Sequence, residues 1–185
     1  MASVGAHLEE DAILVADTGY SAAWAGALAD IRSAGRNFLR ADGSLGWAFP
    51  GALGAQLAAP DRQVVCVIGD GGFGYHVGDI ETAIRIGLPV VVIILNNGTL
   101  AFEQHVQHLL YGKVVPEVND FVDVDYGAIA RAFGANGFRV RNIEEFDAAL
   151  AVGLLRTAPT IIDAMIDPEA IAPVTRYDRV RIRDL

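Results

Sequence analysis

The sequence predicts an α/β fold, a doubly wound and mainly parallel sheet with helices on both faces. Short runs rich in valine, isoleucine and leucine alternate along the chain with longer segments of helical pattern. The runs are continuously apolar, as strands buried on both faces are. Turn residues such as Gly87-Leu88-Pro89 end helical segments just before a strand. Alternation of this kind favours parallel strands joined by right-handed crossovers.

The apolar runs predict five strands, in order Ala12–Ala16, Val64–Ile68, Val90–Leu95, Phe138–Val140 and Thr160–Ile166. The segments between them predict six helices, in order Ser21–Ser33, Ala48–Ala59, Val77–Ile86, Leu100–Leu110, Tyr126–Phe133 and Ile143–Arg156. Lys113–Asp125 is expected to form a long loop. We expect one domain over residues 1–170 and a C-terminal extension over residues 171–185. The arginine-rich part of that extension, Arg176–Arg183, is either a solvated tail or a clamp onto a partner.

Composition excludes several classes of protein. The net charge of −9 argues against nucleic acid as a partner, because phosphate backbones need a basic surface. No apolar stretch reaches the ~18 residues that a membrane-spanning helix needs, and the N-terminus lacks the pattern of a signal peptide, so no membrane association is expected. The single cysteine, Cys66, allows no disulfide within the chain and fits a reducing compartment, so a cytoplasmic location is expected.

Three polar loops follow predicted strands, namely Asp17–Ser21, Gly69–Gly74 and Asn96–Thr99. Ligands of open α/β sheets bind at the carboxyl ends of the strands, where these loops lie. The second loop, Gly69-Asp70-Gly71-Gly72-Phe73-Gly74, has the G-x-G-x-x-G spacing of a dinucleotide site. Its aspartate would repel a phosphate, however, and no acidic residue ends the next strand to hold a ribose. A Walker loop is excluded because the only lysine is Lys113.

A divalent cation between the carboxylate and a diphosphate removes this conflict. Mg²⁺ takes octahedral oxygen ligands, often one or two protein side chains together with phosphate oxygens and water. Asp70, the amide of Asn97 and the carbonyl of Thr99 supply three such oxygens, while Gly71 and Gly72 let backbone N–H groups approach the diphosphate. The simpler interpretation, a tight turn followed by a polar helix cap, stays open for each loop taken singly.

Gly69-Asp70-Gly71, followed after twenty-four residues by Asn96-Asn97, resembles the thiamine diphosphate motif of the superfamily of acetolactate synthase, benzoylformate decarboxylase and pyruvate decarboxylase. The segments Gly43–Pro60, Asp123–Val140 and Ala158–Asp167 resemble other parts of the same C-terminal, diphosphate-binding domain. The resemblance covers roughly residues 10–170. It implies the thiamine diphosphate-binding fold, with thiamine diphosphate and Mg²⁺ as cofactors.

The resemblance also implies site residues. The metal ligands would be Asp70, Asn97 and the Thr99 carbonyl. The cofactor would contact these residues and Thr18, Gly19, Tyr20, Ser21, Gly43, Ser44, Leu45, Gly69, Gly71 and Gly72. Gly43 would accept a hydrogen bond from the exocyclic amine of the cofactor through its carbonyl, and Leu45 would be the apolar wedge that bends the cofactor. Glu103 matches a catalytic glutamate of members similar to pyruvate decarboxylase; the alternative is a solvent-facing residue.

The reaction implied is decarboxylation of a 2-oxo acid or carboligation, and the sequence does not choose between them. The roles of His105 and His108 stay open. Family enzymes also need a pyrimidine-binding domain, which this chain lacks. We therefore expect a pyrimidine-binding partner subunit in a heterotetramer or larger assembly, or else a fragment of a longer enzyme. A non-catalytic assembly subunit of the same fold and, less favoured, an NAD-binding domain are the alternatives.

Overall fold

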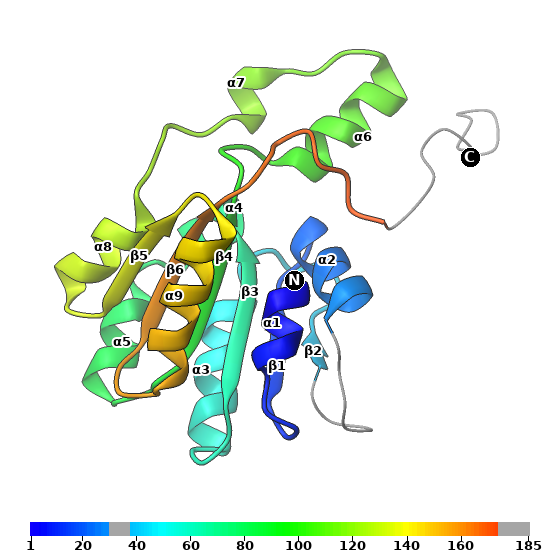
Figure 1. The fold of residues 1–185 in the computed structure, drawn as a ribbon. Coiled ribbons are helices and arrows are strands. Elements are labelled where there is room, and N and C mark those ends of the chain that lie inside the picture. The colour runs from blue at the N-terminus through cyan, green and yellow to red at the C-terminus, as the bar shows by residue number, and fades with distance from the viewer. Residues whose placement is uncertain (30–37, 174–185) are drawn as a thin grey trace.

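The fold is given by a computed structural model, which describes residues 1–29 and 38–173. Within these residues the chain forms one sheet of six parallel strands in the order β2-β1-β3-β4-β6-β5 (Figure 1). Its strands are β1 (Ile13–Ala16), β2 (Phe38–Arg40), β3 (Val64–Gly69), β4 (Val91–Asn96), β5 (Asn136–Val140) and β6 (Thr160–Met165). The predicted doubly wound, parallel fold is confirmed.

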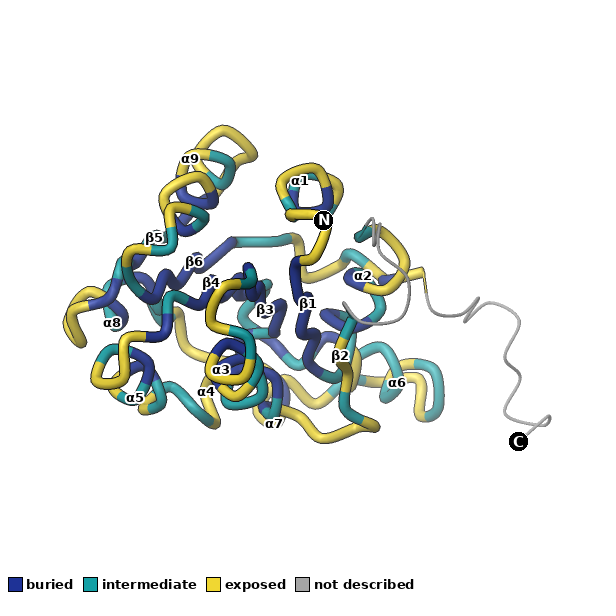
Figure 2. The backbone as a smooth tube through the Cα atoms, turned by 90° about the horizontal axis from the view of Figure 1, so that it is seen from below, coloured by how far each residue is buried: buried dark blue, intermediate teal, exposed yellow. Residues whose placement is uncertain are grey.

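Helices lie on both faces of the sheet (Figure 2). Their bounds are α1 (Ala2–His7), α2 (Tyr20–Leu28), α3 (Ala48–Ala58), α4 (Asp70–Gly74), α5 (Asp79–Arg85), α6 (Ala101–Tyr111), α7 (Pro116–Asn119), α8 (Tyr126–Phe133) and α9 (Ile143–Leu154). Helices α3, α5 and α8 form one core with the sheet, in which Phe49 and Ile80 are fully buried. Helices α1, α2 and α9 form the second core, on the opposite face, around Leu14 and Leu150. Burial of such apolar side chains on both faces is what the continuous apolar strands predicted.

The five predicted strands are present, and their ends differ from the prediction by at most two residues. Strand β2 was not predicted, and the expected loop Lys113–Asp125 contains the short helix α7. The end of the predicted helix Ser21–Ser33 and the arginine-rich segment Arg176–Arg183 lie outside the described residues. Between residues 1 and 173, leaving out 30–37, no helix is long and apolar enough to cross a membrane.

The carboxyl ends of the strands carry the polar loops, as in other open α/β sheets. Helix α4 begins at Asp70, directly after β3, and the Asn97–Leu100 segment leads from β4 into α6. Helices α6 and α7 lie beyond this end of the sheet (Figure 1). An antiparallel bridge between Thr99 and Asp120 fastens the loop after β4 to the segment that follows α7.

Candidate functional site

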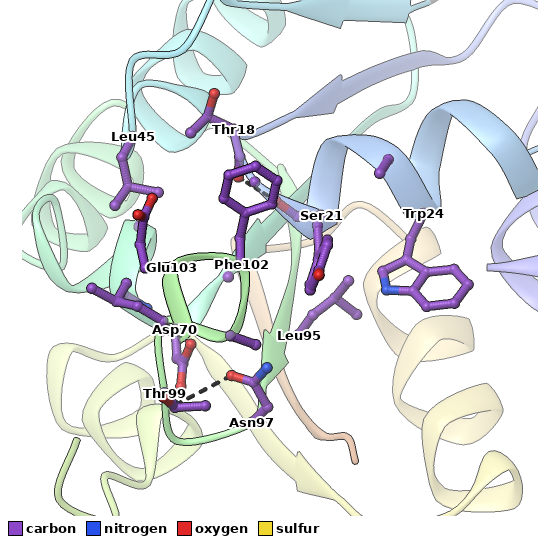
Figure 3. A pocket seen from close by; sticks show the side chains of 18 of the residues that line it. Thr18, Ser21, Trp24, Leu45, Asp70, Leu95, Asn97, Thr99, Phe102 and Glu103 are labelled. Carbon is purple, nitrogen blue, oxygen red and sulfur yellow. Dashed lines mark hydrogen bonds between the residues drawn. The ribbon is translucent and has the colours of Figure 1, made fainter. Parts of the chain in front are cut away.

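A cavity of about 540 Å³ lies at the carboxyl ends of the strands (Figure 3). Of the predicted site residues, all but Ser44 line it, namely Thr18, Gly19, Tyr20, Ser21, Gly43, Leu45, Gly69, Asp70, Gly71, Gly72, Asn97, Thr99 and Glu103. Residues that the sequence did not single out complete the wall, among them Trp24, Arg40, Leu95 and Phe102. The loops after β1, β3 and β4 therefore converge on one cavity.

Asp70 joins two of these loops. Its carboxylate accepts hydrogen bonds from the Gly71 backbone N–H through Oδ1 (3.0 Å) and from the Gly98 N–H through Oδ2 (2.8 Å). The side chain is almost fully buried, and burial raises its pKa to about 6, although the bonds from Gly71 and Gly98 act in the opposite direction. A buried carboxylate whose hydrogen bonds do not offset the effect of burial on its pKa is typical of a functional site. A cation is the partner that would favour its charged form.

The two asparagines at the end of β4 have different surroundings. Asn96 is buried, and its Nδ2 donates to Oδ1 of the buried Asp163 (2.8 Å). Asn97 lines the cavity, and its Oδ1 accepts from the Thr99 backbone N–H (3.3 Å; Figure 3). Asn96 therefore ties β4 to β6, while Asn97 presents an amide oxygen beside Asp70.

The oxygen atoms present fit Mg²⁺. A carboxylate has about four lone-pair positions, and the bonds to Gly71 and Gly98 leave some of them for a metal. The amide oxygen of Asn97 likewise keeps a second lone pair beyond its bond to Thr99. Over the described residues no group of three or more His, Cys, Asp or Glu side chains gathers as a metal site. One carboxylate with neutral oxygens is a donor set that suits Mg²⁺ when phosphate oxygens complete the shell.

Gly71 and Gly72 have a packing reason to be glycine. A Cβ on Gly71 would lie 2.7 Å from Cδ2 of Leu100, and one on Gly72 would lie 2.2 Å from Oδ2 of Asp17. Both distances are shorter than real Cβ contacts allow. The structure shows that the two glycines let α4 pack against its neighbouring loops. Their contact with a diphosphate stays a prediction.

Asp17 is a residue whose role the sequence did not reveal. Its fully buried carboxylate accepts hydrogen bonds from the backbone N–H of Gly46 (3.1 and 2.9 Å) and of Ala48 (3.3 Å). Burial raises the pKa of this carboxyl, and the two backbone bonds oppose that change. Asp17 thereby holds the loop that carries Gly43 and Leu45 at the cavity. A charged residue placed directly after a fully apolar strand was the signal that could have identified it.

In the loop after β1, the residues Gly19, Tyr20 and Ser21 have different structural roles. Gly19 has a φ of 83°, which a residue with a side chain adopts only under strain, and it precedes α2. The Ser21 hydroxyl donates to the backbone carbonyls of Asp17 and Thr18 (3.2 and 2.9 Å). Tyr20 reaches across to α6, where its hydroxyl lies 2.6 Å from Nδ1 of His105.

Helix α6 supplies another side of the cavity. Phe102 and Glu103 line it and are both exposed to solvent, so neither alternative for Glu103 is excluded. Glu103 and Leu45 point toward one another (Figure 3). His105 contacts Tyr20, whereas His108 is exposed and does not line the cavity. Arg40, at the end of the unpredicted strand β2, is the one cationic side chain among the described lining residues. The structure thus brings a carboxyl group, a guanidinium and aromatic rings to one space.

Residues 17–164 match the family model of the thiamine pyrophosphate enzymes, C-terminal TPP binding domain; thiamine pyrophosphate is another name for thiamine diphosphate. The chain is 34% identical over 169 residues to a putative thiamine pyrophosphate-containing protein, YdaP, of Bacillus subtilis, covering 89% of this chain and 28% of that protein. It is 36% identical over 134 residues to benzoylformate decarboxylase of Pseudomonas aeruginosa, covering 72% of this chain and 25% of that enzyme.

Among solved structures, the thiamine diphosphate-dependent 4-hydroxybenzoylformate decarboxylase of Rhodococcus jostii matches with a TM-score of 0.78 and 34% identity. The match covers 90% of this chain and 31% of that one. The chain therefore spans less than a third of the length of these relatives. With the sheet, the cavity and the family model in agreement, the chain belongs to the thiamine pyrophosphate enzymes, and residues 17–164 correspond to their C-terminal TPP binding domain.

Proposed function

We propose that this chain is the diphosphate- and Mg²⁺-binding subunit of a thiamine diphosphate-dependent 2-oxo acid decarboxylase or carboligase. The observation that carries the proposal is the position of Asp70 and Asn97. They directly follow the neighbouring strands β3 and β4, line one cavity, and offer oxygen atoms for a magnesium site beside a glycine-rich loop. An NAD-binding role would leave the buried Asp70 carboxylate facing a phosphate without a cation.

In this proposal Asp70, Asn97 and the Thr99 carbonyl hold Mg²⁺. The backbone of Gly71, Gly72 and the Thr18–Ser21 loop lies against the diphosphate, since these groups line the same cavity. Gly43 and Leu45 contact the rest of the cofactor from the loop that Asp17 holds. Thiamine diphosphate, when bound, supplies an electron sink for cleavage of the bond between the 2-oxo carbon and the carboxylate.

The substrate is an anion, and the cavity contains one cationic side chain, Arg40, among its described lining residues. A guanidinium binds carboxylates through paired hydrogen bonds, so Arg40 attracts and orients a 2-oxo acid. Glu103 lines the cavity beside Leu45 and donates or accepts the proton that the reaction requires. Phe102 covers part of the wall with an aromatic ring and limits the water that enters.

A second domain completes the site. The chain spans less than a third of its relatives' length, and in this proposal the loops of its one described sheet hold only the diphosphate and the metal. We propose that a separate pyrimidine-binding partner subunit supplies the rest, in a heterotetramer or larger assembly with the cofactor between the two chains. The residues at the open side of the cavity, among them Leu45 and Glu103, would face that partner.

Reconstitution tests this function. The purified chain is mixed with a candidate pyrimidine-binding chain from the same genome, thiamine diphosphate and Mg²⁺, and CO₂ release is measured from a panel of 2-oxo acids. We expect release only when all four components are present. Assembly with the partner but no turnover of any 2-oxo acid would instead identify a non-catalytic subunit. NAD binding tighter than thiamine diphosphate binding would contradict the proposal.

A further inference from the structure

Helix α6 places Glu103 and Phe102 at the cavity, yet few of its residues are buried against the rest of the fold. Among its residues only Ala101 is buried, and the helix lies beyond the end of the sheet (Figure 1). On one side it contacts α7 through polar side chains, chiefly Gln107, which is paired with Asn119 (2.9 Å). Few buried apolar contacts and many exposed backbone hydrogen bonds are typical of segments that open locally at low cost.

On its other side, α6 is contacted by Tyr20. The Tyr20 hydroxyl lies 2.6 Å from Nδ1 of His105, and the two rings are 5.5 Å apart. The same tyrosine meets the Phe102 ring edge-on, with ring centroids 5.4 Å apart. Phe102 and His105 are three residues apart and so share one face of α6, which faces α2. One side chain therefore contacts two successive turns of α6.

The position of Tyr20 connects this contact with the proposed cofactor site. Tyr20 is the first residue of α2, and like Thr18 and Gly19 before it, it lines the cavity where the diphosphate is proposed to bind. Glu103, which lines the cavity, lies between Phe102 and His105 on α6, the helix that Tyr20 contacts. The contact thus links the loop after β1 to the helix that presents the proposed acid–base group.

We propose that Tyr20 and His105 form a positioning pair, which holds α6 so that Glu103 and Phe102 face the cavity. Neither side chain of the pair acts on the substrate. The hydrogen bond and the two ring contacts restrict the position of α6, and a carboxyl group that must transfer a proton within hydrogen-bond reach depends on that restriction. The structural part of this proposal stands on the contacts alone; its kinetic part rests on the proposed function.

Hydrogen exchange of the whole chain, without ligand, tests the structural part. Tyr20→Phe keeps the ring and removes the hydroxyl, and His105→Asn removes the imidazole. The α6 amides are expected to exchange about fivefold faster in each variant, the change that loss of one hydrogen bond produces. Tyr111→Phe and His108→Asn are matched controls on the same helix, because both side chains are exposed. Exchange of α6 that is unchanged in Tyr20→Phe and His105→Asn overturns the proposal.

Kinetics of the reconstituted enzyme test the second part. Tyr20→Phe keeps the backbone that is proposed to lie against the diphosphate, and it is expected to lower kcat several-fold while leaving the KM for the 2-oxo acid near that of the parent. In a Glu103→Gln background the same substitution should then have no further effect on kcat, since its action passes through Glu103. Equal fold-changes in both backgrounds would overturn the positioning role. If the parent turns over no 2-oxo acid, the proposed function fails, while the exchange measurement still decides whether the pair holds α6.

Discussion

Gly72 and Asp17 approach so closely that no side chain fits between them: a Cβ on Gly72 would lie 2.2 Å from the carboxylate Oδ2 of Asp17. This contact joins the loop after β3, which carries Asp70, to the aspartate that holds the Gly43–Leu45 loop through Gly46. The loops after β1 and β3 and the Gly43–Leu45 loop therefore depend on one another for their positions.

Gly72→Ala should destabilise the fold and weaken cofactor binding. The added methyl group meets a buried carboxylate that is fixed by two backbone N–H donors, so the loops must separate, at a cost of roughly 1–3 kcal/mol. Urea unfolding followed by circular dichroism measures the loss. Gly74→Ala is the matched control in the same helix, because its Cβ would meet only the Tyr126 hydroxyl, at 3.7 Å. Equal stability of the two variants would contradict this account.

Asp17→Asn should change the pH dependence of stability. Burial raises the pKa of Asp17 above 3.8, so the folded chain binds this proton more tightly than the unfolded chain does. The stability contributed by Asp17 is therefore greatest below pH 3.8 and falls as the pH rises through the raised pKa. The free energy of unfolding of the parent relative to Asp17→Asn should fall over this range and then level off. A difference that rises with pH would show that folding lowers the pKa of Asp17 and does not raise it.

Substitution of the two neighbouring asparagines should separate stability from binding. Asn96→Ala removes the buried partner of Asp163 and is expected to cost about 1–3 kcal/mol of folding free energy. Asn97→Ala removes one bond to the Thr99 N–H, so it should leave unfolding nearly unchanged but weaken Mg²⁺-dependent binding of thiamine diphosphate. Thermal unfolding and calorimetric titration of both variants measure the two effects. The reverse pattern would assign the ligand role to Asn96.

Arg40→Gln should raise the KM for a 2-oxo acid in the reconstituted enzyme by about tenfold or more, because it removes a charge-assisted hydrogen bond that contributes roughly 1.5–3 kcal/mol. The affinity for thiamine diphosphate should change little, since Asp70 and Asn97 are untouched. Arg40→Lys keeps the charge and loses the paired geometry, and we expect an intermediate KM. If Arg40→Gln weakens the cofactor instead, Arg40 contacts the diphosphate.

The central strands and the three polar loops could be predicted from the sequence because each has a strong local signal. Val64–Ile68 is an unbroken apolar run, and Asp70 interrupts a glycine loop that otherwise resembles a dinucleotide site. Strand β2 has no such signal, because it is three residues long, lies at the edge of the sheet, and exposes Leu39 and Arg40. Because β2 could not be predicted, Arg40 could not be identified from the sequence as a residue of the cavity.

Other features depend on contacts between distant segments, which one sequence does not reveal. Strand β5 begins two residues earlier than predicted, at Asn136-Gly137, where polar and small residues hide the apolar pattern. Gly137 is there because a Cβ would lie 2.0 Å from the Gly127 carbonyl oxygen of the packed helix α8. The pairing of Tyr20 with His105 joins residues 85 positions apart and likewise has no local signature.

Calorimetric titration with thiamine diphosphate, with and without Mg²⁺, tests the central claim most directly. The parent chain, alone and with its partner, and the variants Asp70→Ala and Asp61→Ala are compared; Asp61 is exposed and precedes β3, at the end of that strand opposite to the site loop. We predict binding that requires Mg²⁺ in the parent and in Asp61→Ala, and no Mg²⁺-dependent binding in Asp70→Ala. Binding that is indifferent to Mg²⁺, or unchanged in Asp70→Ala, would contradict the assignment of Asp70 as the carboxylate of a metal-bridged diphosphate site.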